Sequence, residues 1–192
     1  MPKNNRHGKA EVLTEEYREK IKQHLPTARD RLLFAIAEYT GERWGAIVQL
    51  QVRYVYADPS RSLPLEQITF PARNRKGKRD TRQVPVHPSL KELLMAHKPP
   101  ASGWLFPSSQ NPENHLPFST ADKMFRQTLF KAGLQDKGIS LHSTRHTFVT
   151  QISQQFDIHV VQQLTGHRSL SVLAGYIKAD PDLLKQAIAC LP

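Results

Sequence analysis

The sequence is poor in cysteine and has no long hydrophobic run. Cys190 is the single cysteine among 192 residues. This count excludes a disulfide scaffold and any zinc or iron–sulfur site that needs several thiolate ligands. No apolar stretch approaches the roughly 20 residues of a membrane-spanning helix, and residues 1–10 lack the apolar core of a signal peptide. Since 39% of the residues are hydrophobic, the chain can still form a core. We expect a soluble, cytoplasmic protein without membrane association.

Acidic residues are scarce beside basic ones. The chain has 27 Lys and Arg against 17 Asp and Glu, which gives a formal charge of +10. The first ten residues contain no acid, and residues 71–82 carry one acid, Asp80, among six cations: Arg73, Arg75, Lys76, Lys78, Arg79 and Arg82. An excess of positive charge that is concentrated in two segments predicts a polyanionic partner, with nucleic acid as the leading candidate. The alternative is a solvated loop and tail that only keep the protein in solution.

Hydrophobic periodicity predicts a mainly helical α+β domain with one small antiparallel sheet. Thr14 and Thr27 are placed as N-caps of two helices, the second of which Gly41 interrupts, and a short helix follows at 44–50. The expected strands are 52–56, 67–70 and 83–86, and a capping box at 89–92 opens another helix. The stretch 98–117 reads as loop, and residues from 119 onward read as helices. Among these, Phe125, Leu129 and Ala132 share one face before a stop at Gly133, and Val149, Ile152 and Phe156 share another.

Residues 138–178 combine basic and imidazole side chains with a single carboxylate, Asp157. Magnesium-dependent phosphoryl chemistry clusters several carboxylates, so this segment alone cannot support it. His142 and His146 have the i, i+4 spacing of a metal pair, but no third ligand is suggested nearby. His142 and Arg145 are three residues apart and therefore project from one helix face. Tyr176 lies nine residues after His167 and could supply a nucleophilic oxygen.

These residues resemble the tyrosine recombinase (integrase) family. His142-Ser-Thr-Arg145 matches the H-x-x-R helix of that family, Leu164-Thr-Gly-His167 matches its L-G-H turn, and Tyr176 follows at the usual distance. Upstream, Thr40-Gly-Glu-Arg43 resembles the segment that carries the first catalytic arginine. The basic turn at 76–78 before 84–86 resembles the β-hairpin of the catalytic lysine. We assign that role to Lys76, with Lys78 as the alternative.

The resemblance implies a catalytic-domain-like helical bundle that cuts and rejoins duplex DNA without metal or ATP. By this analogy, Tyr176 attacks a phosphodiester to form a 3′-phosphotyrosine link, and a 5′-hydroxyl from a partner strand reverses the step. Arg43 and Arg145 would bind the nonbridging oxygens, and Lys76 would protonate the departing 5′-oxygen. His142 would transfer a proton and His167 would donate a hydrogen bond to the phosphate. The remaining cations of the basic turn would contact DNA: Arg73, Arg75, Lys78, Arg79 and Arg82.

Two positions depart from the family pattern. An acidic residue often follows the first arginine by three positions, where this chain has Ala46, and Asp commonly follows the first histidine, where it has Ser143. These departures support an alternative: a DNA-binding regulatory protein that keeps the fold without the activity. A third reading, a relaxing enzyme like type IB topoisomerases, shares the chemistry but acts as a monomer without strand exchange.

The domain organisation follows from the same resemblance. We expect a flexible basic arm at 1–12 and one catalytic domain at 13–192, without the N-terminal DNA-clamping domain that many members carry. The expected last helix, 181–192, has a continuous apolar stripe. It would dock on its own chain or be exchanged between subunits of a homotetramer on DNA. Without DNA we expect a monomer or a weak oligomer.

Overall fold

The computed structural model describes residues 10–74, 80–166, 170–174 and 189. The chain divides into two compact units, residues 1–148 and 149–192, which are treated separately below. The expected division into a basic arm and one catalytic domain stays a prediction. Residues 1–9 and nearly all of the expected last helix lie outside the described residues.

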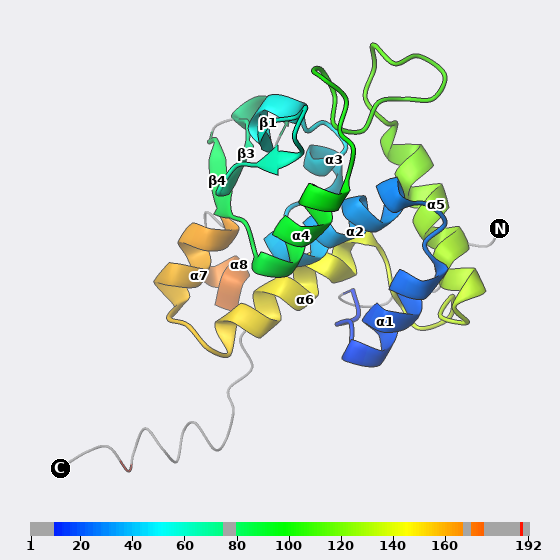
Figure 1. The fold of residues 1–192 in the computed structure, drawn as a ribbon. Helices are drawn as coiled ribbons and strands as arrows, with labels where there is room; N and C mark the ends of the chain where they lie inside the picture. The colour runs from blue at the N-terminus through cyan, green and yellow to red at the C-terminus, as the bar shows by residue number, and fades with distance from the viewer. Residues whose placement is uncertain (1–9, 75–79, 167–169, 175–188, 190–192) are drawn as a thin grey trace. The chain divides into compact units, whose positions relative to one another are not determined.

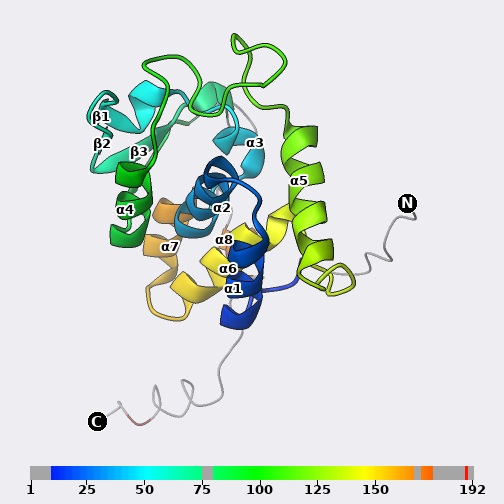
Figure 2. The same cartoon turned by 45° about the vertical axis from the view of Figure 1, so that its right-hand side comes forward.

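The first unit is a helical assembly around α2 (Ala28–Thr40). The other helices that lie in it are α1 (Glu15–His24), α3 (Trp44–Ile47), α4 (Pro88–Ala96) and α5 (Phe118–Lys131), and α6 (Leu141–Ser153) begins in it. In both views of the ribbon, α2 lies between α4 and α5 (Figures 1 and 2). Its Leu32, Leu33, Phe34 and Ile36 are all buried, so this helix is apolar on most of its circumference and forms the centre of the core.

Local signals in the sequence are confirmed at the N-termini of α1 and α2 and at the C-terminus of α2. Thr14 Oγ1 accepts the N–H of Tyr17 at the start of α1, and Thr27 Oγ1 accepts that of Asp30 at the start of α2. Gly41 ends α2 in the left-handed conformation, with φ at 60°. The expected cap of α4 is wrong: His87 caps it, because its ring accepts the N–H of Ser89 and Pro88 occupies the first helical turn.

The strands form two separate two-stranded antiparallel sheets instead of one. β1 (Tyr56–Asp58) pairs with β2 (Leu63–Pro64), and β3 (Gln67–Phe70) pairs with β4 (Arg82–Pro85). The expected strand at 52–56 is wrong, because 52–54 is a 3₁₀ turn. In that turn Val52 and Val55 are both buried, and their i, i+3 spacing places them on one side of a 3₁₀ turn.

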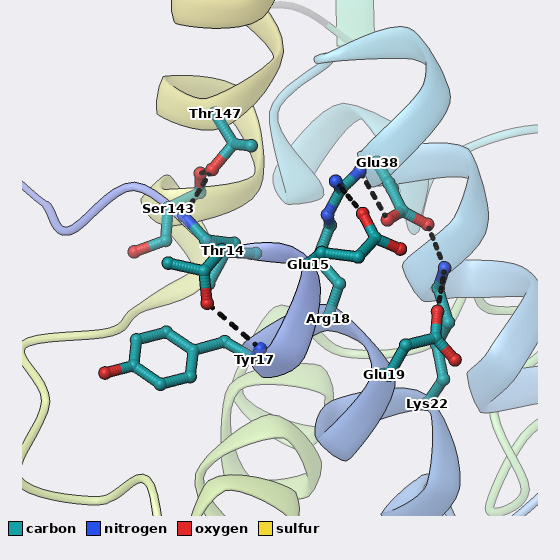
Figure 3. A network of polar contacts seen from close by, with 10 residues as sticks. Thr14, Glu15, Tyr17, Arg18, Glu19, Lys22, Glu38, Ser143 and Thr147 are labelled. Atoms are coloured by element: carbon teal, nitrogen blue, oxygen red, sulfur yellow. Dashed lines mark hydrogen bonds and ion pairs between the residues drawn. The ribbon is translucent and has the colours of Figure 1, made fainter.

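Polar contacts fix α1 against α2 and α6 (Figure 3). The N–H of Leu13 donates to Thr147 Oγ1 over 2.7 Å, and Thr147 Oγ1 in turn donates to the carbonyl of Ser143. Across α1 and α2, the carboxylate of Glu38 lies 3.6 Å from Arg18 Nη1 and 3.4 Å from Lys22 Nζ. Burial raises the pKa of Glu38, and these two cations only partly offset that rise.

The buried residues of helices α5 and α6 largely match the apolar faces that the sequence predicted. Phe125 and Leu129 are buried on α5, and the helix ends before Gly133, which has φ at 68°. Val149 is buried, but Phe156 is exposed because α6 already ends at Ser153. The predicted loop at 98–117 is confirmed apart from isolated bridges.

The second unit contains α7 (Ile158–Thr165) and α8 (Leu170–Ala174), which pack against one another. The carboxylate of Asp157 caps α7 by accepting the N–H of His159, and Gly166 ends it with φ at 65°. Within the described ranges, no helix is both long and apolar enough to cross a membrane.

Candidate active site

The first turn of α6 carries two of the predicted site residues. His142 is exposed, whereas Ser143 and Thr144 turn into the core and Arg145 is only 8% exposed. Trp44 Nε1 donates to Thr144 Oγ1 over 3.1 Å in the interior. Together with the bond from Leu13 to Thr147, this contact fixes the rotation of α6 about its axis. In the H-S-T-R sequence the histidine therefore faces outward, and the three residues that follow are buried and hold the helix in place.

The buried guanidinium of Arg145 reaches the turn that carries Arg43. Arg145 Nη1 donates to the carbonyl of Gly41 over 2.9 Å, although 104 residues separate them. Arg43 follows two positions later, is exposed, and begins α3 as its N-cap residue. The structure thus brings together the two segments that carry the predicted arginine pair.

Gly41 allows this approach of α6 to the turn. A Cβ atom at this position would lie 2.2 Å from Cδ1 of Phe148 on α6. The left-handed backbone and the absence of a side chain are both required, so glycine is the residue that fits. In this close packing the carbonyl of Gly41 accepts the hydrogen bond from Arg145 Nη1.

Glu42 is a site residue that the sequence reasoning missed. It is completely buried, its Oε2 lies 2.8 Å from Arg82 Nη1, and its Oε1 accepts the N–H of Arg43 over 2.8 Å. Burial alone would raise the pKa of Glu42. The charge of Arg82, the N–H of Arg43 and the charge of Arg145 outweigh burial and hold this pKa below its usual value. The signal in the sequence was an acidic residue directly after Gly41, which ends a helix with a continuous apolar stretch from Leu32 to Ala37.

Arg82 corrects one of the predicted DNA contacts. Its side chain is buried on β4, where Nη1 pairs with Glu42 and Nη2 donates to the carbonyl of Thr40 over 2.7 Å. Because the buried carboxylate of Glu42 already neutralises this guanidinium in the interior, it is not presented to an external phosphate. The assignment of Arg82 to DNA binding is therefore wrong.

The rest of the basic turn joins β3 to β4. Arg73 is exposed and lies 3.5 Å from the hydroxyl of Tyr54. The turn is held on one side by Asn74 Nδ2, which donates to the carbonyl of Gln49, and on the other by Thr81 Oγ1, which accepts the N–H of Ala72. Four of the predicted cations lie outside the described residues: Arg75, Lys76, Lys78 and Arg79.

The two predicted residues of the second unit also lie outside the described part of the chain. His167 directly follows Gly166 at the end of α7, and Tyr176 comes two residues after α8. Before His167, Thr165 is buried and donates to the carbonyl of Val161 over 2.6 Å. Their assignments remain predictions. Among the residues that the structure describes, no group of three or more His, Cys, Asp or Glu is arranged to hold a metal ion.

Comparison with known proteins identifies the family. The sequence profile of the phage integrase family matches residues 11–182. This chain belongs to the phage integrase family. The match includes the Arg43 turn, the basic turn, the H-S-T-R helix and the segment that contains His167 and Tyr176. The mainly helical fold class that the sequence predicted, with its small antiparallel elements, is confirmed for this integrase-family chain.

The relatives agree with this assignment. Tyrosine recombinase XerA of Pyrococcus furiosus is 29% identical over 184 residues, which cover 92% of this chain and 60% of the relative. Tyrosine recombinase XerH of Campylobacter jejuni is 37% identical over 70 residues, 36% of this chain and 20% of the relative. This integrase-family chain thus spans about 60% of the XerA length.

Solved structures share the fold. The XerH recombinase bound to its difH substrate, in a pre-cleavage complex, has a TM-score of 0.71 at 24% identity. The match covers 93% of this chain and 54% of XerH. The catalytic domain of bacteriophage HP1 integrase has a TM-score of 0.67 at 21% identity, and each chain is covered over 96% of its length. The phage integrase family chain therefore has the architecture of an integrase catalytic domain.

Proposed function

We propose that this chain is a site-specific DNA recombinase or integrase that cuts and rejoins duplex DNA through a 3′-phosphotyrosine at Tyr176, without metal or ATP. The contact from Arg145 to the Gly41 carbonyl carries the proposal, because it places the two arginine segments side by side. Family membership and the named tyrosine recombinases among the relatives support the same reaction.

The chemistry needs cations around a phosphate. A free tyrosine has a pKa of about 10, so ionising it at pH 7 costs about 4 kcal/mol. In the proposed reaction, the Tyr176 oxygen attacks phosphorus while the bond from phosphorus to the 5′-oxygen breaks. Arg43 and Arg145 bind the nonbridging oxygens and stabilise the charge of the transition state. The 5′-oxygen leaves with a proton from Lys76.

The two imidazoles complete the proposed site. His142, exposed on the first turn of α6, serves in proton transfer with the tyrosine hydroxyl. His167 donates a hydrogen bond to the phosphate. The 5′-hydroxyl of a partner strand then attacks the phosphotyrosine, which releases Tyr176 and joins new ends.

Duplex DNA is the proposed partner. The formal charge of +10 and the exposed Arg73 support phosphate contacts, with Arg75, Lys78 and Arg79 extending them along the β3–β4 connection. The XerH and Tn1549 integrase structures among the neighbours contain DNA. We propose a homotetramer on DNA, a monomer or weak oligomer without it, and action in the cytoplasm.

The structure gives a local role to one departure from the family pattern. Ser143 is fully buried, and its Oγ accepts the N–H of Ser140 over 3.1 Å at the start of α6. A serine in this position reaches back to the N–H that precedes the helix, as the third helical residue of a capping box does, and so stabilises the start of the helix that carries His142 and Arg145. This observation weakens the alternative of an inactive regulatory protein, for which Ser143 was one of two arguments.

A covalent-trapping experiment tests the proposal. The full chain is incubated with a library of nicked duplexes with randomised arms. After cleavage, the short fragment between the cleavage point and the nick, which carries the free 5′-hydroxyl, diffuses away, so the reaction cannot reverse. We expect an adduct that survives detergent and selects one sequence class. Tyr176→Phe should abolish the adduct, whereas Tyr17→Phe on α1 should leave it unchanged. Salt-sensitive binding without any adduct in the wild-type chain would favour the inactive alternative.

A further inference from the structure

Four internal contacts converge on the turn at residues 40–43. Arg82 from β4 binds the Thr40 carbonyl and Glu42, Arg145 from α6 binds the Gly41 carbonyl, and Glu42 binds the N–H of Arg43. We propose that Glu42 and Arg82 form a buried lock that positions Arg43 and Arg145 for one phosphate. This inference rests on the proposed function, and it assigns positioning roles to two residues that touch no substrate.

The lock holds both ends of the turn at once. Arg82 uses one nitrogen for the carboxylate of Glu42 and the other for the carbonyl of Thr40, at 2.8 and 2.7 Å. The other carboxylate oxygen of Glu42, Oε1, accepts the backbone N–H of Arg43. Charge-assisted bonds of this length are the strong class of hydrogen bond, and Thr40, Glu42 and Arg82 are buried. The backbone that carries Arg43 is therefore constrained on both sides.

The lock also places a negative charge where two positive charges must gather. Arg43 and Arg145 are expected to meet on one phosphate, and before DNA binds their charges repel one another. The buried carboxylate of Glu42 bonds the backbone of Arg43 and is attracted by the charge of Arg145. It therefore lowers the cost of holding the two guanidiniums ready, which is electrostatic preorganisation of the site.

Ala46, three positions after Arg43, is a buried alanine on α3 and supplies no carboxylate. The carboxylate beside Arg43 is that of Glu42, which accepts the backbone N–H of Arg43 from the interior and has Arg82 as its counter-ion.

The same ion pair connects the arginine turn to the β-hairpin. Arg82 lies opposite Phe70 in the register of β3 and β4, at the end of the strand nearest the basic turn. A shift of this strand would pull on Glu42 and hence on Arg43. The lock thus couples the positions of the hairpin and of the arginine turn.

Single-turnover cleavage of the duplex selected from the nicked library tests the lock. Glu42→Gln keeps the shape and the acceptor for the Arg43 N–H but removes the charge. We expect its cleavage rate to fall about 100-fold, the size of effect that a 1 Å misplacement produces. The Kd for DNA should stay within about threefold, because surface phosphate contacts dominate affinity. Glu66→Gln is the matched control, since Glu66 pairs with Lys91 on the surface and should leave the rate unchanged.

A modified substrate separates positioning from general damage. A methylphosphonate at the scissile position replaces one charged nonbridging oxygen, so the arginine pair has less charge to stabilise. The rate gap between the wild-type chain and Glu42→Gln should shrink at least tenfold on this substrate. An equal gap on both substrates would show general damage and overturn the proposal.

The double variant Glu42→Gln/Arg82→Met guards against unfolding. Removing one partner of a buried ion pair leaves an uncompensated charge, whereas replacing both leaves none. We expect the double variant to fold and still to cleave slowly. Wild-type cleavage by either folded variant overturns the lock and leaves the proposed function intact. A wild-type chain that forms no adduct on any duplex overturns the proposed function, and the lock with it.

Discussion

Gly41→Ala is the substitution for which the structure gives the clearest expected cost. The new Cβ would lie 2.2 Å from Cδ1, 2.5 Å from Cγ and 2.9 Å from Cε1 of Phe148. Carbon atoms in good contact lie about 3.5 to 4 Å apart, so the ring must retreat by more than about 1 Å. The residue must also keep a left-handed backbone.

Each of these two effects has a known size. A non-glycine residue in the left-handed region costs about 1–2 kcal/mol, and overpacking of an interior costs about 1–3 kcal/mol. We therefore expect Gly41→Ala to lower the free energy of unfolding by about 2–5 kcal/mol. Gly133→Ala is the matched control, because Gly133 also has a positive φ but a Cβ there meets nothing within 4 Å. Gly133→Ala should therefore lower the free energy of unfolding only by the backbone cost of about 1–2 kcal/mol.

Urea denaturation followed by circular dichroism measures both variants, and Phe148→Ala completes the cycle. With the ring removed, Gly41→Ala should cost no more than Gly133→Ala does. An equal loss of stability for Gly41→Ala and Gly133→Ala in the wild-type background would refute the contact between the turn and α6. The Gly41 carbonyl accepts from Arg145, so Gly41→Ala should also slow DNA cleavage, whereas Gly133→Ala should not.

Two further predictions concern charge. Burial raises the pKa of Glu38, so the folded state favours its neutral form. Glu38→Gln should therefore raise the thermal midpoint at pH 7, and its advantage should disappear as pH falls through the raised pKa of Glu38 toward 4.5. A lower midpoint at pH 7 would contradict this reasoning. If the chain neutralises about six phosphates of the DNA, the logarithm of its DNA-binding constant should fall with the logarithm of the salt concentration at a slope near −5. Arg73→Ala should make that slope about 0.9 shallower and Arg126→Ala on α5 should not, whereas equal slopes in all three would remove Arg73 from the interface.

Local rules predicted the features of the fold that depend on neighbours in the sequence. The N-caps at Thr14 and Thr27 and the helix end at Gly41 depend on a few adjacent residues, and the structure has them where they were expected. The strand at 52–56 failed because β-branched residues fit a buried 3₁₀ turn as well as a strand. The N–H of Val52 bonds the carbonyl of Gly103, and this partner, far along the chain, is invisible to a local rule.

The candidate site shows the same limit. The spacing of His142 and Arg145 on one helix could be predicted, because the helical period fixes it. The roles of Glu42 and Arg82 could not, since 40 residues separate them and charge alone assigned Arg82 to DNA. A basic residue in a basic segment is indistinguishable from its neighbours until its buried partner is known.

Peptide mapping of the trapped adduct is the most direct test of the central claim. After nuclease and protease digestion, mass spectrometry should find a nucleotide joined through its 3′-phosphate to Tyr176, and the released strand should end in a free 5′-hydroxyl. A nucleotide on any other side chain, or a link through the 5′-phosphate, would contradict the account of how this chain cuts DNA.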